Sequence, residues 1–320
     1  MRLTLVLTAA AAMAAIPLAP STAQTAPAVD VPADAPPGLF SGERTSEILT
    51  VQILLDRAKH SPGAIDGMMG GNTRRAISAY QRANGMPVTG EPDAALLQSL
   101  EGGSSDFLKR YRITEEDVAG PFLSVPSDFA AKAEIEKPTF ESPAEGLAEK
   151  FHMAESFLQA LNPGADFGSA GSEILVINAG PDELNSKVSR IEVDKAANEL
   201  RAYSADGGLV ATYPTTVGSS IHPSPNTKLE VLAIASDPTY HFDPEDRSWG
   251  PDHEFTIAAG PNNPVGTVWI DLSQDGYGIH GTPDPELIGK TSSHGCVRLT
   301  NWDAAELSKV VSKGTTVTFV

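Results

Sequence analysis

The sequence predicts a mostly β domain in its C-terminal part, preceded by a small three-helix domain and a small α+β module. Between residues 45 and 101, apolar residues recur every three or four positions, which is the period of an α-helix. From Val188 onward, apolar and polar residues alternate, which is typical of strands with one buried face. The 320 residues suffice for two or three small domains of this kind.

The N-terminal residues 1–23 have the pattern of a secretory signal peptide. Arg2 is followed by an apolar run and then by Ser21-Thr22-Ala23, as at a cleavage site. A membrane anchor is the alternative, but prolines interrupt the run, and a bilayer span needs roughly 20 apolar residues. We therefore expect a secreted protein of the periplasm or cell wall without a transmembrane anchor. Residues 24–44, rich in Pro and Ala, are interpreted as a flexible linker.

Residues 45–101 are predicted to form three short helices around a small core. Ser46, Asn72 and Asp93 are each placed to cap one helix. The Asp66-Gly67 pair is interpreted as a turn, because the alternating ligands of a calcium loop do not follow it. The apolar faces consist of Ile48, Val51, Leu54, Leu55 and Ala58, of Ala76, Ile77, Tyr80 and Ala83, and of Leu96, Leu97 and Leu100.

Residues 104–180 are predicted to form the α+β module in the order strand, helix, helix, strand. The strands are expected at residues 111–113 and Glu173–Ile177, and the helices at residues 142–151 and 153–161. This order is similar to a degenerate LysM module, which is a glycan-binding fold. A spacer that packs on the following domain is the alternative.

Residues 186–320 are predicted to form the mostly β domain. Strands are expected at residues 190–193, 199–203, 209–213, 229–234, 255–257, 268–272, 279 and 315–320. Residues 236–252 are expected to form a long loop. One helix is expected over residues 301–311, and its inward face consists of Trp302, Ala305, Leu307 and Val310.

The composition excludes some classes of function. The 41 acidic and 23 basic residues give a formal charge of −18, which argues against nucleic-acid binding because phosphate neutralisation requires clustered Lys and Arg. The histidines at positions 222, 241 and 253 lack the spacing of zinc peptidases, so we expect no metal site.

Cys296 is the one cysteine of the chain, so it has no internal disulfide partner. Gly295 precedes it, and His280 lies sixteen positions upstream. A thiol close to a histidine is what a nucleophilic cysteine enzyme requires, because the base helps to form the reactive thiolate. A buried, unreactive cysteine of the core is the alternative interpretation.

The surroundings of Cys296 resemble the signature of L,D-transpeptidases of the YkuD type, which cross-link bacterial peptidoglycan. The segments that carry the resemblance are residues 260–266, 278–283, 288–289 and 292–299. The resemblance implies a β-sandwich domain with one or two helices. Separately, the order Val51-Gln52, Ile65-Asp66-Gly67, Thr73, Ala79-Tyr80-Gln81, Gly85 and Gly90 resembles the three-helix peptidoglycan-binding domain.

The resemblance implies a role for each residue of the motif. Cys296 would be the nucleophile and His280 the base, with the backbone carbonyl of Gly281 as the third partner of the histidine. We expect the backbone N–H groups of Gly295 and Cys296 to converge on the oxyanion, because a glycine lets the chain bend there. Ser293 is assigned to the same oxyanion and substrate site.

Other residues near the motif have two interpretations each. His294 either shapes the donor site or contacts substrate, or it forms a hydrogen bond that only stabilises the loop. Arg298 either pairs with a substrate carboxylate or forms an internal ion pair with Asp303 or Glu306. Trp269 and Tyr277 either line the substrate groove or belong to the core.

The resemblance also implies the reaction. Cys296 would attack the diaminopimelate carbonyl of a tetrapeptide stem and release D-alanine. An amine of a neighbouring stem would then resolve the thioester to a 3→3 cross-link. No cofactor takes part, the partners are peptidoglycan stem peptides and glycan, and carbapenem-type β-lactams are expected inhibitors.

Two other functions remain open. The same thioester could be resolved by water, which would make the protein a carboxypeptidase or endopeptidase that trims stems or releases a tethered lipoprotein. A non-catalytic wall-binding protein is the other alternative. The acceptor is the open point, because residues 223–227 lack the glycine of the Thr-Pro-x-Gly turn that is common in the family.

Overall fold

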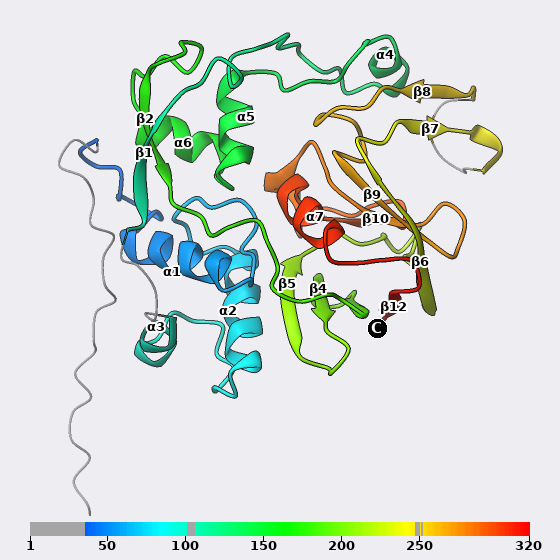
Figure 1. The fold of residues 1–320 in the computed structure, drawn as a ribbon, viewed down its shortest axis with the longest axis horizontal. Coiled ribbons are helices and arrows are strands. Elements are labelled where there is room, and N and C mark those ends of the chain that lie inside the picture. The colour runs from blue at the N-terminus through cyan, green and yellow to red at the C-terminus, as the bar shows by residue number, and fades with distance from the viewer. Residues whose placement is uncertain (1–35, 101–105, 247–249, 251) are drawn as a thin grey trace, which may run out of the picture.

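The computed structural model describes residues 36–100, 106–246, 250 and 252–320 (Figure 1). The expected signal peptide and most of the expected linker therefore lie outside the described residues. Within the described residues, no helix is both long and apolar enough to cross a membrane.

Three helices follow one another in the N-terminal part, as the apolar period predicts: α1 (Ser46–Arg57), α2 (Gly71–Ala83) and α3 (Ala94–Leu100). The predicted cap of α3 is confirmed, since Asp93 Oδ1 accepts from Leu96 N at 2.8 Å. The other two predicted caps are wrong. The cap of α1 is Thr45, one residue before Ser46. The cap of α2 is Gly70, and the Asn72 side chain instead donates to the carbonyl of Ile288 at 2.9 Å.

The Asp66-Gly67 pair forms a tight bend, as predicted, and the buried side chain of Gln52 holds it. Gln52 Nε2 donates to Asp66 Oδ1 at 2.9 Å, and Gln52 Oε1 accepts from Gly67 N at 2.7 Å. The carboxylate of Asp66 also accepts from Met68 N at 2.8 Å. The polar groups of the bend are thus satisfied within the domain.

The α+β module has the predicted order of strand, helix, helix, strand. Its strands β1 (Leu108–Arg112) and β2 (Glu173–Ile177) pair antiparallel, and α5 (Pro143–Lys150) and α6 (Glu155–Leu161) lie between them in the chain. An additional short helix, α4 (Phe129–Ala133), was not predicted. It packs against β8 (Phe255–Ile257) of the C-terminal domain through Phe129 and Phe255, whose ring centroids are 5.9 Å apart.

The three-helix domain and the α+β module share one hydrophobic core, which runs from Leu39 to Ile177. Ile65 is fully buried in it, and its backbone bonds with the module: Ile65 N donates to His152 O at 2.8 Å, and Ala154 N donates to Ile65 O at 2.9 Å. We call residues 39–177 the N-terminal body, because neither part keeps an intact core without the other.

The C-terminal domain is built on one mostly antiparallel sheet of eight strands. Its strands are β3 (Arg190–Asp194), β4 (Glu199–Tyr203), β5 (Leu209–Pro214), β6 (Lys228–Ser236), β9 (Val268–Leu272), β10 (Gly278–His280), β11 (Val297–Arg298) and β12 (Thr316–Phe319). The order across the sheet is β11-β10-β9-β6-β12-β3-β4-β5, with parallel pairing only for β10 with β11 and for β12 with β3. The mostly β fold class is therefore confirmed.

The helix α7 (Asn301–Ser308) lies between the sheet and the N-terminal body (Figure 1). Leu307 and the partly buried Ala305 pack against the core of the sheet, as predicted, together with Ala304. Val310 also packs there, as predicted, but it lies beyond the helix, which ends at Ser308. Trp302 was predicted to face the same way, but it packs against His152 of the N-terminal body. The segment predicted as a long loop contains β7 (Tyr240–Phe242), which pairs with β8 (Phe255–Ile257). Two short 3₁₀ helices, Pro244–Asp246 and Pro285–Leu287, complete the domain.

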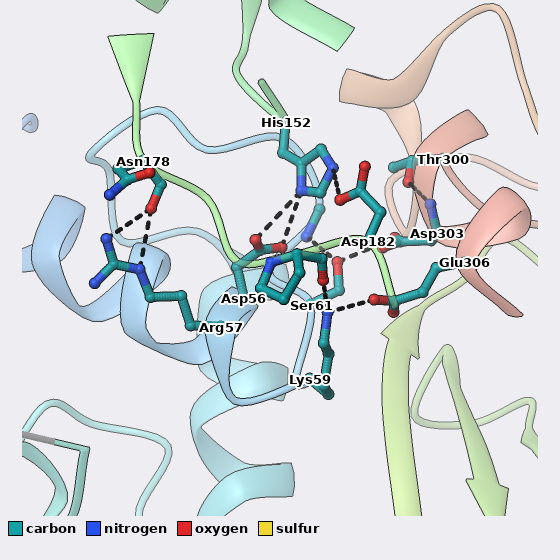
Figure 2. A network of polar contacts seen from close by, with 12 residues as sticks. Asp56, Arg57, Lys59, Ser61, His152, Asn178, Asp182, Thr300, Asp303 and Glu306 are labelled. Carbon is teal, nitrogen blue, oxygen red and sulfur yellow. Dashed lines mark hydrogen bonds and ion pairs between the residues drawn. The ribbon is translucent and has the colours of Figure 1, made fainter. Parts of the chain in front are cut away.

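A polar network joins the N-terminal body to the C-terminal domain (Figure 2). His152 Nδ1 lies 3.2 Å from a carboxylate oxygen of Asp56, and His152 Nε2 lies 3.2 Å from one of Asp182. Burial alone would lower the pKa of His152, but these two carboxylates outweigh it and raise the pKa to about 10. His152 is therefore a buried cation at neutral pH.

The same network reaches α7 through two further contacts (Figure 2). Lys59 forms an ion pair with Glu306, and Ser61 Oγ donates to Asp303 Oδ2 at 3.0 Å. Asp303 N in turn donates to Thr300 Oγ1 at 3.1 Å, which caps the helix. The first turns of α7 are thus held by side chains of the N-terminal body.

Candidate active site

Strand pairing brings the predicted base next to the strand that directly follows the predicted nucleophile. The strands β10 and β11 run parallel, with His280 opposite Arg298 in the register. Residues that lie opposite each other in a parallel pair are on the same face, so His280 and Arg298 share one face. Cys296 immediately precedes β11, in the bend formed by residues 294–296, and Arg298 interacts electrostatically with both Cys296 and His280. The opposite face, with Ile279 and Val297, is buried in the core.

Cys296 is half-buried, and its Sγ lies 3.5 Å from the carbonyl oxygen of Gly276. Two serine hydroxyls hold the loop around it. Ser293 Oγ donates to Cys296 O at 2.6 Å, and Ser224 Oγ donates to Gly295 O at 2.6 Å. The thiol is therefore presented by a loop whose carbonyls are fixed from two sides.

Gly295 is required by the geometry of this loop. Its φ is +122°, a conformation that side-chain-bearing residues rarely adopt, and a Cβ there would lie 2.8 Å from the ring of Tyr277. Its amide N donates to Ser293 Oγ at 3.0 Å. This contact differs from the expectation that the amide points at the oxyanion together with that of Cys296, because the amide already has an acceptor within the loop.

His280 is buried and stacks on Trp269, with ring centroids 5.4 Å apart and 23° between the planes. Its Nδ1 lies 2.7 Å from the carbonyl oxygen of Gly281, which is the contact predicted for that carbonyl. A carbonyl only accepts, so Nδ1 carries the proton and Nε2 keeps its lone pair. Burial, followed by the charge of Arg298, lowers the pKa of His280 to about 3. The ring is therefore a neutral base at neutral pH.

Trp269 and Tyr277, for which two positions were open, both lie at the site. Trp269 Nε1 donates to Asp271 Oδ1 at 3.2 Å, which fixes the indole over β10. Gly278 leaves room for it, since a Cβ there would lie 2.5 Å from the indole ring. Together these contacts hold the indole ring on which His280 stacks.

Arg298 is half-buried beside Cys296. Burial lowers its pKa, while the nearby Cys296, Asp284 and Tyr240 oppose that shift. Its Nε is buried and has no hydrogen-bond partner among the described residues. Among the described residues, Arg298 forms no ion pair with Asp303 or Glu306, which was the alternative interpretation. Asp303 instead accepts from Ser61, and Glu306 pairs with Lys59.

His294 is exposed next to Cys296, and its ring lies 5.1 Å from that of His222. Burial, His222 and Arg298 together lower the pKa of His294. His222 was missed as a neighbour of the site, because nothing in its proline-rich segment signals that the chain folds back there. Among the described residues, no group of three or more His, Cys, Asp or Glu side chains is arranged to hold a metal ion.

A cavity of about 780 Å³ lies between the N-terminal body and the residues that follow Thr282. Its lining from the two sides includes Glu141, Glu145 and Glu149, and Asp284 and Glu286. The approach to the loop of His280 from this side is therefore acidic.

Comparison with known proteins finds two families in the chain. The family of the YkuD L,D-transpeptidase catalytic domain matches residues 189–319, and a family described as a peptidoglycan binding domain matches residues 44–100. A protein of Bacillus licheniformis named L,D-transpeptidase YkuD is 34% identical over 176 residues, which are 54% of this chain and 90% of that protein. The protein of the same name from Bacillus subtilis is 29% identical over 172 residues, again 54% of this chain and 90% of its own.

The chain belongs to the YkuD family of L,D-transpeptidases and carries an N-terminal peptidoglycan-binding domain. A solved L,D-transpeptidase of Mycobacterium smegmatis is similar to it at 21% identity and a TM-score of 0.34, over 48% of this chain and 64% of that one.

Proposed function

We propose that the protein forms 3→3 cross-links in peptidoglycan through a thioester on Cys296. The observation that carries the proposal is that Cys296, immediately before β11, and a neutral His280 on the paired strand β10 both lie close enough to Arg298 to interact with its charge. A thiol becomes a strong nucleophile when a neighbouring base removes its proton, and a neutral imidazole can act as that base.

The first half-reaction follows from these roles. His280 Nε2 accepts the thiol proton as sulfur attacks the diaminopimelate carbonyl of a tetrapeptide stem. The proton then passes to the amine of the departing D-alanine, leaving the thioester and a neutral histidine. The hydrogen bond from His280 Nδ1 to Gly281 O stabilises the imidazolium while it carries the proton.

In the second half-reaction an amine of a neighbouring stem attacks the thioester. His280 takes a proton from that amine and returns it to the sulfur as the new amide forms. The developing oxyanion would be stabilised by the backbone N–H of Cys296, and the amide of Gly295 would join it once Ser293 releases its present hydrogen bond.

Arg298 is proposed to bind a carboxylate of the stem peptide. Its half-buried guanidinium lies close to Cys296, and its Nε has no hydrogen-bond partner in the part of the chain that the structure describes. A guanidinium pairs with a carboxylate through two parallel hydrogen bonds, and partial burial strengthens such a pair. The peptidoglycan-binding domain, residues 44–100, is proposed to retain the enzyme at the wall after secretion.

Mass spectrometry of muropeptides tests the proposal. Disaccharide tetrapeptides are incubated with the mature protein and, as the control, with Cys296→Ala. We expect dimers with a 3→3 link, and exchange of the fourth residue when a D-amino acid is added, because a positioned amine can outcompete abundant water. Tripeptide without dimer or exchange product would instead identify a carboxypeptidase, and no product with either protein would leave a wall-binding role.

Carbapenem-type β-lactams are proposed to acylate the same thiol. Attack of sulfur on the lactam carbonyl opens the ring, and the lactam nitrogen takes the proton that His280 carries. Intact-protein mass spectrometry should show one adduct per chain, and Cys296→Ala should show none.

A further inference from the structure

Asn301, the first residue of α7, is buried and uses its whole side-chain amide. Its Oδ1 accepts from Thr267 N and from Thr282 N, both at 3.2 Å. Its Nδ2 donates to Glu149 Oε2 at 3.0 Å and to Pro261 O at 3.3 Å. The opposite orientation would set an NH₂ group against two N–H donors, so the partners fix the amide as it stands.

These bonds connect Asn301 to the base. Thr282 lies two residues after His280, and Gly281 between them supplies the carbonyl that binds His280 Nδ1. Gly281 packs directly on Asn301, since a Cβ at Gly281 would lie 2.2 Å from Asn301 Oδ1. Gly266 packs on the same oxygen, where a Cβ would lie 2.1 Å away. Asn301 thus holds the peptide whose carbonyl selects the tautomer of His280.

Glu149, which holds the amide of Asn301 in turn, belongs to α5 of the N-terminal body. It lies 152 positions earlier in the chain and is 9% exposed. Burial raises the pKa of Glu149 to about 8, with Glu145 adding to the shift and the bond to Asn301 opposing it. A protonated carboxyl keeps a carbonyl oxygen, so the bond to Asn301 survives in both protonation states.

We propose that Glu149 and Asn301 are positioning residues for His280, so that the N-terminal body completes the active site. Glu149 fixes the Asn301 amide, the amide fixes the peptide at Gly281, and that carbonyl keeps the proton of His280 on Nδ1. The inference rests on the role proposed for His280 but not on the identity of the acceptor. It gives the N-terminal body a part in the chemistry besides wall binding.

The test measures two properties that do not require transpeptidation. One is the rate at which iodoacetamide alkylates Cys296 at pH 7, followed by mass spectrometry. The other is the tautomer of His280, read from the ¹⁵N chemical shifts of the imidazole. Both are recorded on the full mature chain for Glu149→Leu, Glu149→Gln and the control Glu155→Leu, which alters a glutamate on the neighbouring helix α6.

We expect Glu149→Leu to slow alkylation by about tenfold or more, short of the roughly 10²–10⁴-fold expected for loss of a general base. Its His280 should populate both tautomers. Glu149→Gln keeps an acceptor oxygen and should stay close to the wild-type rate, as should Glu155→Leu. A folded Glu149→Leu protein with the wild-type rate and tautomer would overturn the proposal, as would alkylation that does not depend on His280.

A substitution of Asn301 keeps the test decisive if Glu149→Leu does not fold. Asn301→Leu removes the oxygen that accepts from Thr282 N and should slow alkylation. Asn301→Asp keeps that oxygen and faces a Glu149 that is protonated at pH 7 and can donate to it, so its rate should stay close to that of the wild type. A folded Asn301→Leu protein with the wild-type rate and tautomer would overturn the proposal, as would an Asn301→Asp protein as slow as Asn301→Leu. If alkylation behaves as expected but muropeptides give no cross-link, the proposed function fails and the positioning roles stand.

Discussion

The imidazole of His152 stacks on the indole of Trp302, with ring centroids 5.2 Å apart and 11° between the planes. His152 belongs to the N-terminal body and Trp302 to the first turn of α7, next to Asn301. The helix end that docks on the N-terminal body is therefore also the one that holds the loop of His280. Docking and catalytic geometry are linked through two adjacent residues.

The charge of His152 makes this junction sensitive to alkaline pH. Its pKa in the folded protein is about 10, above the value of 6.5 expected in the unfolded chain. The stabilisation is therefore fully present below pH 6.5 and is lost as pH rises through 10. Urea unfolding at pH 6, 8 and 10 should show the wild type losing stability over this range.

Two variants isolate the contribution of His152. His152→Gln keeps a donor without a titrating charge, so its stability should fall less between pH 6 and 10. The control His241→Gln, at an exposed position on β7, should follow the wild type. Parallel curves for wild type and His152→Gln across that range would contradict the assignment of the charge.

Cys296→Ala is expected to abolish turnover and leave the fold intact. The sequence has no second thiol, and the loop around the half-buried Cys296 is held by hydrogen bonds from the hydroxyls of Ser293 and Ser224 to the backbone carbonyls of Cys296 and Gly295. Activity on muropeptides and the thermal midpoint check the two halves of the prediction. Residual thioester formation in the variant would end the assignment of the nucleophile.

His280 should matter more than His294. Replacing His280 by Gln removes the base and should lower the acylation rate by roughly 10²–10⁴-fold. His294→Ala should cost much less, since His294 is exposed and its ring faces His222. Single-turnover acylation of both variants by a carbapenem measures this, and an essential His294 with a dispensable His280 would reverse the two roles.

The sequence predicted the elements better than their contacts. Helical and alternating periods located most helices and strands, because burial of one face dictates them locally. The cap of α1 was misplaced by one residue because Thr45 and Ser46 are both good caps. Asn72 was misread because its side chain bonds to Ile288, a contact between domains that local pattern does not contain.

The candidate site shows the same division. Cys296, His280 and the carbonyl of Gly281 follow from a motif within one stretch of chain. Glu149 was missed because a glutamate on an amphipathic helix is usually a solvated residue, and only the docked fold brings it to Asn301. The packing partner of Trp302 was predicted wrongly because the sheet covers one face of α7 and the N-terminal body covers another. The apolar pattern of the helix does not show which of the two a given residue contacts.

Arg298 is expected to act on both substrate and base, and two substitutions separate these effects. Its charge helps to lower the pKa of His280, so Arg298→Gln should raise that pKa and move the acid limb of kcat/KM to higher pH. Arg298→Lys keeps the charge and should leave the acid limb in place.

Both variants lose the bidentate pair with the substrate carboxylate and should raise KM for stem peptides by about 10-fold or more, given roughly 1.5–3 kcal/mol for a charged hydrogen bond. Acylation by a small β-lactam that lacks the stem should change less. An unchanged KM in both variants would show that Arg298 is structural, and an unchanged acid limb in Arg298→Gln would show that its charge does not reach His280.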